Sequence, residues 1–166
     1  TGGEPLLRKD ITNLIAMIRQ CGPKLDIALP TNGSLLARFA SRLKQAGLDR
    51  VTVSLDGIDE QIVKRISNSN VSPNDIISGI QAAAETGLRV KVNTVIIKNY
   101  NENQIIPITS IFRKMNVVVR FIEYMDVGGT KDWDPSQVVF GDDIRSVIAS
   151  KFGKLQAVED LSLIHI

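Results

Sequence analysis

Polar side chains recur where the predicted strands of this chain end. They are Thr31, Asn32, Ser54, Asp56, Asn93, Glu123 and Asp126. A short segment, Gly2-Gly3-Glu4-Pro5, offers backbone that a ligand can approach closely, because neither glycine has a Cβ. On its own this segment is more typical of a turn between a strand and a helix. Together with the polar residues, it predicts a ligand site at the ends of the strands.

Two predicted strands separate polar from apolar side chains by simple alternation. In residues 51–55 the valines share one face, whereas Thr52 and Ser54 share the other with Asp56. In residues 89–95, Lys91 and Asn93 likewise stand opposite the valines. Such residues are unusual inside parallel strands, which are normally apolar on both faces. We interpret the polar face as the inside of a barrel that holds a ligand. The alternative is that Lys91 extends along a strand edge to solvent.

The elements that must position these residues alternate regularly along the chain. Apolar spacing predicts helices over 10–20, 34–46, 62–66, 76–86, 103–115 and 142–152. Strands are predicted over 25–29, 51–55, 89–95 and 117–124. Asp10 and Ser34 are the expected caps of the first two helices.

This alternation predicts right-handed βαβ units on a parallel sheet. Two architectures fit it, an open doubly wound sheet and part of a (β/α) barrel. In both, ligands bind at the carboxyl ends of the strands.

Composition excludes several other classes of protein. The 166 residues suit one domain, and their net charge of +2 does not favour nucleic acid or a membrane surface as a partner. No apolar run approaches the roughly 20 residues of a membrane span. The single cysteine, Cys21, cannot hold an iron–sulfur cluster.

Five separated segments resemble one family of enzymes. They are TGGEPLLRKDI, PTNG, VTVSLDG, VKVNTVI and RFIEYMDVG, and the resemblance runs from Thr1 to about Glu159. Together they are similar to the GTP 3′,8-cyclase family of radical S-adenosylmethionine (SAM) enzymes, which act in molybdenum cofactor synthesis. The resemblance implies an α/β fold, a partial (β/α)6 TIM-like barrel of parallel strands with crossover helices. Residues 1–160 would form the central and C-terminal part of the barrel in a longer parent enzyme.

The last six residues, 161–166, resemble the translated end of a sequencing adapter. We expect them to be non-native. No chemistry is therefore assigned to His165, the only histidine.

The resemblance also implies a reaction and its cofactors. The parent would be a lyase that uses a 5′-deoxyadenosyl radical from SAM to convert GTP to (8S)-3′,8-cyclo-7,8-dihydroguanosine 5′-triphosphate. Two [4Fe-4S] clusters would serve the parent, and neither has ligands in this chain, which alone should be inactive. The next pathway enzyme would be cyclic pyranopterin monophosphate synthase. The parent would be cytoplasmic, or organellar in a eukaryote, and able to form a homodimer.

Site residues carry over from the family one by one. Gly3, Ser54 and Met125 would contact SAM, and Lys91 would face GTP. The family usually has Thr-Thr-Asn-Gly where this chain has Pro30-Thr31-Asn32-Gly33. Pro30 has neither a hydroxyl nor a backbone N–H, so the usual GTP contact of the first threonine cannot form there, whereas Thr31 remains available. No catalytic residue and no metal ligand is assigned within this chain.

Two other functions remain open at this point. One is a different radical SAM enzyme, for example a peptide-modifying one, which would share the GGEP segment and the serine late in a strand. The other is a small-molecule-binding α/β domain without redox chemistry.

Overall fold

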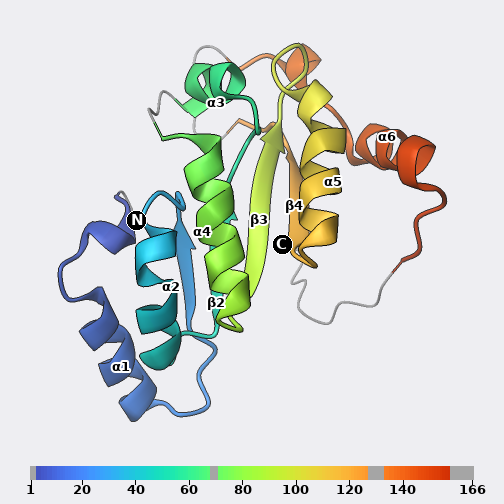
Figure 1. The fold of residues 1–166 in the computed structure, drawn as a ribbon. Coiled ribbons are helices and arrows are strands. Elements are labelled where there is room, and N and C mark those ends of the chain that lie inside the picture. The colour runs from blue at the N-terminus through green and yellow to red at the C-terminus, as the bar shows by residue number, and fades with distance from the viewer. Residues whose placement is uncertain (1–2, 68–70, 127–132, 158–166) are drawn as a thin grey trace.

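A four-stranded parallel sheet forms the centre of the computed structural model, which describes residues 3–67, 71–126 and 133–157. The strands lie side by side in chain order (Figure 1). They are β1 (Ala28–Thr31), β2 (Arg50–Ser54), β3 (Arg89–Ile96) and β4 (Val118–Glu123). All three strand pairs are parallel, so all four carboxyl ends meet at one edge of the sheet.

Helices alternate with the strands along the chain. They are α1 (Ile11–Cys21), α2 (Leu36–Gln45), α3 (Glu60–Ser67), α4 (Pro73–Glu85), α5 (Ile105–Lys114) and α6 (Gly141–Phe152). Of these, α2, α3, α4 and α5 lie between successive strands and form the crossovers. Short 3-10 turns occupy Pro5–Leu7, Glu102–Gln104 and Pro135–Gln137. Within the described residues, none of these helices is long and apolar enough to cross a membrane.

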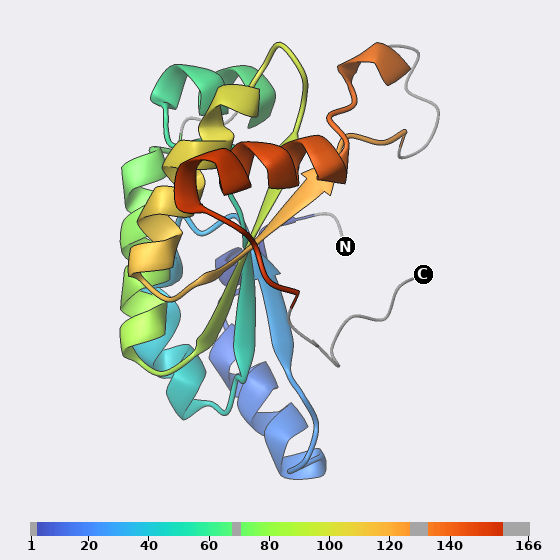
Figure 2. The same ribbon diagram turned by 90° about the vertical axis from the view of Figure 1, so that its right-hand side faces the viewer.

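Helices cover only one face of the sheet. In Figure 2, α2, α4 and α5 lie together on one side, and the opposite face carries no helix in the described part of the chain. The covered face packs fully buried side chains of the sheet and helices, among them Val51, Val53, Val92, Leu36, Ile80 and Phe112. Burial of such a side chain contributes roughly 1.5–3 kcal/mol. One-sided covering is typical of a barrel wall and unlike a doubly wound sheet, which confirms the predicted α/β fold with crossover helices.

The first strand begins later than its apolar pattern predicts. The prediction over 25–29 is wrong at both ends, because the strand pairing starts at Ala28 and continues through Pro30 and Thr31. The residues before it are held by side-chain contacts instead, since Asp26 forms ion pairs with Arg50 and Arg89.

One of the two predicted helix caps is wrong. Asp10 is the N-cap residue of α1, although its side chain makes no capping hydrogen bond to the helix. Ser34 does not cap the next helix, whose N-cap residue is Leu35. Helix α2 begins at Leu36, and the backbone N–H of Ser34 donates to Asn32 Oδ1 in a local turn. At α4, Ser72 does cap the helix, where its hydroxyl oxygen accepts from the backbone N–H of Asn74 at 3.3 Å.

Candidate functional site

A groove of about 480 Å³ opens at the carboxyl ends of β1 and β2. It brings together four of the six predicted site residues, which are Gly3, Pro30, Thr31 and Ser54. Lys91 lies deeper on the open face of the sheet, and Met125 follows β4 with 55% of its surface exposed. Met125 does not line this groove.

The Glu4 carboxylate joins the GGEP segment to the end of β1. Its Oε1 accepts from the Thr31 hydroxyl at 2.6 Å and from the backbone N–H of Leu6 at 3.1 Å. Its Oε2 accepts from the backbone N–H of Asn32 at 2.7 Å. Sequence reasoning gave Glu4 no role, although a carboxylate beside a Thr-Asn turn could have suggested one.

Thr31 has its hydroxyl engaged within the protein. Besides donating to Glu4, the hydroxyl oxygen accepts from the backbone N–H of Gly33 at 3.1 Å, and the residue is only 5% exposed. The structure therefore gives Thr31 a clear part in holding the shape of the groove.

Gly3 presents open backbone. A Cβ built at this position would meet no atom within 4 Å. Packing within the described residues therefore does not require a glycine here. Close approach of a ligand would require one.

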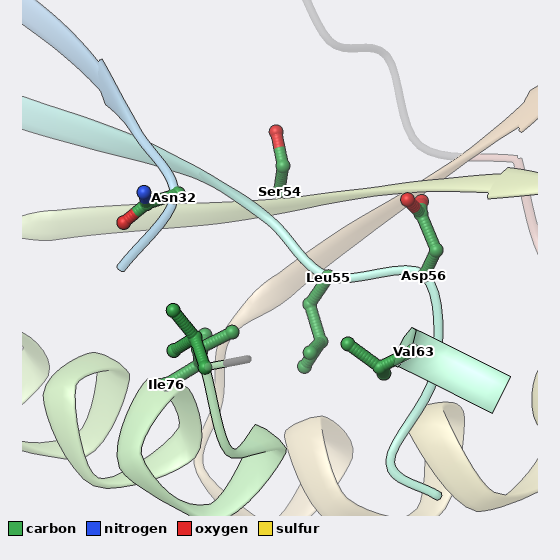
Figure 3. A pocket seen from close by; sticks show the side chains of 7 residues that line it. Asn32, Ser54, Leu55, Asp56, Val63 and Ile76 are labelled. Carbon is green, nitrogen blue, oxygen red and sulfur yellow. The ribbon is translucent and has the colours of Figure 1, made fainter. Parts of the chain in front are cut away.

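Ser54 and Asp56 point toward the open side of the sheet. Figure 3 shows both side chains directed away from the helices, whereas Leu55, Val63 and Ile76 lie on the helix side of a small cavity of about 100 Å³. Burial raises the pKa of Asp56, and the hydrogen bond that its Oδ1 accepts from the backbone N–H of Val95 at 2.8 Å opposes this shift. A partly desolvated carboxyl group thus lies next to the groove.

Strand register arranges the open face in two polar rows. The outer row, nearer the carboxyl ends, aligns Ser54 with Asn93 and Arg120, and the inner row aligns Pro30 with Thr52 and Lys91. Asn93 Oδ1 is buried and has no hydrogen-bond partner among the described residues, which is costly unless a ligand supplies a donor. Sequence reasoning missed Arg120, although alternation along 117–124 would have placed it on this face.

Glu123 serves a structural contact at the end of β4. Its Oε1 accepts from the backbone N–H of Gly141 at 2.6 Å, at the first turn of α6. This residue was counted among the polar strand ends, but the contact directs it toward a helix and not toward the groove.

The residues of this chain fit SAM better than they fit an iron–sulfur cluster. The open backbone at Gly3 and the Ser54 hydroxyl, which points to the open side of the sheet, suit a small polar molecule. Among the described residues, no group of three or more histidine, cysteine or acidic side chains could hold a metal. Cys21 ends α1, where Arg19 donates to the backbone oxygen of Gly47 just before β2. The only thiol is therefore at the amino ends of the strands, opposite the groove.

Comparison with known proteins gives one family. Residues 1–110 match the family model of the radical SAM superfamily. A GTP 3′,8-cyclase of Staphylococcus carnosus (strain TM300) is 44% identical over 159 residues, which is 96% of this chain and 46% of that enzyme. The chain thus spans about half the length of that relative.

Solved structures share the fold at low sequence identity. A domain of pyruvate-formate lyase-activating enzyme from Bacteroides vulgatus superposes with a TM-score of 0.68 at 15% identity, covering 90% of this chain and 88% of that domain. TYW1, in a structure with a lysine-pyruvate adduct bound, gives the same TM-score at 18% identity, covering 90% of this chain and 48% of TYW1. With its parallel one-sided sheet and its matched family model, this chain belongs to the radical SAM superfamily.

Proposed function

We propose that this chain is the central part of a GTP 3′,8-cyclase. The observation that carries the proposal is 44% identity to such an enzyme over 96% of the chain. The polar open face, with two cationic side chains at Lys91 and Arg120, suits a substrate that carries a triphosphate.

The residues have separate tasks in this proposal. The backbone at Gly3 lies against the amino-acid end of SAM, the Ser54 hydroxyl forms a hydrogen bond to SAM, and Met125 contacts the adenine. Lys91 binds GTP on the inner row. Reductive cleavage of SAM at a [4Fe-4S] cluster supplies the radical chemistry when those groups are bound. The barrel wall holds the reacting atoms together and excludes water.

Pro30 and Thr31 line the groove without a direct donor for GTP. Pro30 has no hydroxyl, and the Thr31 proton is donated to Glu4. We therefore assign Thr31 to positioning the end of β1. Binding of GTP then depends on the other polar residues of the open face.

The remaining features belong to the full-length protein. Its two [4Fe-4S] clusters have their ligands outside this chain, since the chain has one cysteine. The product passes to cyclic pyranopterin monophosphate synthase. We also propose a cytoplasmic location, or an organellar one in a eukaryote, and a homodimeric assembly.

Anaerobic turnover of the full-length protein tests the proposal. With iron and sulfide restored, SAM and a reductant, we expect 5′-deoxyadenosine and the cyclised nucleotide to form together when GTP is present. Mass spectrometry detects both products, and omission of GTP is the control. Cleavage of SAM without consumption of GTP would indicate another radical SAM enzyme. A protein that neither binds nor cleaves SAM would be a simple binding domain.

A further inference from the structure

Thr52 lies in the middle of the inner polar row. Strand register aligns it with Pro30 on one side and with Lys91 on the other. Neighbouring strands are roughly 4.8 Å apart, which is less than the length of a nucleotide, so one bound nucleotide can span both residues. Thr52 is half-buried on the open face, one step deeper than Ser54.

The Thr52 hydroxyl is free, unlike those of the other two threonines on the first three strands. Thr31 donates to Glu4 at 2.6 Å, and Thr94 donates to the backbone oxygen of Leu55 at 2.8 Å. Within the part of the chain that the structure describes, the Thr52 side chain makes no hydrogen bond. A half-buried hydroxyl without a protein partner is available to a ligand.

Other polar groups on the open face could also form hydrogen bonds to a ligand. Strand register aligns Pro30, Thr52 and Lys91 in the inner row. Pro30 offers no hydrogen-bond donor, so Thr52 and Lys91 supply the hydrogen-bonding side chains of these three. In the outer row, Asn93 Oδ1 is buried and has no hydrogen-bond partner in the part of the chain that the structure describes. A molecule with both donors and acceptors would therefore satisfy groups in both rows.

We infer that Thr52 is a further substrate-binding residue, whose hydroxyl donates to an oxygen of the nucleotide held by Lys91. The inference rests on the proposed function, because it takes the nucleotide to be GTP. A hydroxyl suits this position because it can donate to a phosphate or ribose oxygen beside an ammonium and still accept a second bond.

Substitution of Thr52 by valine in the full-length protein tests the inference. Valine keeps the shape and favours a strand, so the variant should fold. Loss of one hydrogen bond should weaken GTP binding roughly two- to twelvefold, measured by calorimetric titration. Thr52→Ser keeps the hydroxyl and should bind within about twofold of the wild type. Affinity for SAM should not change in either variant.

Thr94→Val is the matched control. It removes a hydroxyl from the opposite, buried face of the next strand, so it should lower the unfolding temperature and leave GTP affinity unchanged. If the wild type binds GTP and Thr52→Val binds it equally well, the inference is wrong and the proposed function stands. A wild type that binds SAM but not GTP would overturn the proposed function and this inference with it.

Discussion

Glu4 shows how a single side chain shapes the groove. Its two oxygens accept three hydrogen bonds that join the GGEP segment, the end of β1 and the first 3-10 turn. Glu4→Gln replaces one acceptor oxygen with an amide donor, which would face the N–H groups it should accept from. Because hydrogen bonds to a charged group contribute about 1.5–3 kcal/mol each, we expect this change to lower the free energy of unfolding by about that amount.

Urea unfolding of the chain measures this effect. Thr31→Val is the comparison variant. It removes one of the three bonds to Glu4 and also the bond that the Thr31 hydroxyl accepts from the backbone N–H of Gly33, while both backbone bonds to Glu4 remain. Equal stabilities for the wild type and Glu4→Gln would show that the carboxylate does not hold the groove together.

Lys91 provides the sharpest residue-level test of GTP binding. Lys91→Ala in the full-length protein should weaken GTP binding by roughly one to two decades, as expected for the loss of a charge-assisted contact of about 1.5–3 kcal/mol. Cleavage of SAM in the absence of GTP should be largely retained, since Lys91 lies on the inner row and away from Gly3. Calorimetric titration with GTP measures the change.

A lysine on the far side of the sheet is the control for Lys91. The ammonium of Lys44, on α2, donates to the backbone oxygen of Gly87 at 2.9 Å, so Lys44→Ala should not alter the affinity for GTP. A dissociation constant unchanged by Lys91→Ala would remove Lys91 from the GTP site.

The variant Pro30→Thr tests whether the proline deprives the inner row of a hydrogen bond to GTP. Pro30→Thr places a hydroxyl beside Thr52, and a neutral hydrogen bond contributes about 0.5–1.5 kcal/mol. We therefore expect GTP to bind roughly two- to twelvefold more tightly in the full-length protein, again by calorimetric titration. Part of the gain is offset if proline also orders the turn, because its fixed φ limits the unfolded chain. A variant that is less stable and binds GTP no better would make Pro30 a structural choice.

At the scale of elements, apolar spacing predicted the order and type of the helices and strands. It failed at β1, where the apolar run 25–29 includes Asp26 and the paired strand includes an exposed proline. Spacing records which side chains are apolar, and the register of β1 depends on backbone pairing with β2 and on ion pairs from distant segments. Such pairings are tertiary, so the sequence alone could not place this strand.

The same limit applies to the candidate site. Alternation placed Ser54, Lys91 and Asn93 on one face, which the strand register confirms. It could not reveal that Thr31 is engaged by Glu4 while Thr52 is free, because Glu4 and Thr31 are 27 positions apart in the chain. The type of a residue shows what it can bond, and the fold decides which partner it meets.

Asp49 links two elements and gives the chain a pH-dependent stability. It accepts from the backbone N–H of Ile27 at 2.7 Å, and this bond, with the nearby Arg19 guanidinium, lowers the pKa of Asp49. A lowered folded-state pKa contributes stability that is present above the usual aspartate pKa of about 3.9 and is lost as pH falls through the folded value.

Asp49→Asn should therefore destabilise the chain at neutral pH and have less effect in acid. Since a third of the Asp49 side chain is exposed, screening limits the expected loss to about 1 kcal/mol at pH 7. Urea unfolding at pH 7 and near pH 3 measures how this difference shrinks. A difference of the same size at both pH values would contradict the assigned role of the carboxylate.

At the scale of the whole molecule, the sheet has a covered face and an open face. The open face carries the polar rows, and its groove lies at the carboxyl ends of the strands. The open face therefore carries Ser54 and Lys91, which the proposed function assigns to SAM and GTP. The covered face holds the buried core, and the open face presents polar side chains that a ligand can contact.

The position of Cys21 gives a final prediction at this scale. The thiol lies at the end of α1 by the amino ends of the strands, whereas the groove proposed to bind SAM lies at the carboxyl ends. A [4Fe-4S] cluster is held by several cysteine thiolates, so those ligands must come from other parts of the full-length protein, where we expect a Cys-x-x-x-Cys-x-x-Cys segment. Cys21→Ser in that protein should leave the iron content, the visible absorbance of the cluster and the cleavage of SAM unchanged. Replacement of any cysteine of the expected segment should abolish all three. Loss of iron in Cys21→Ser would show that the thiol reaches the cluster, which would contradict its position at the amino ends of the strands.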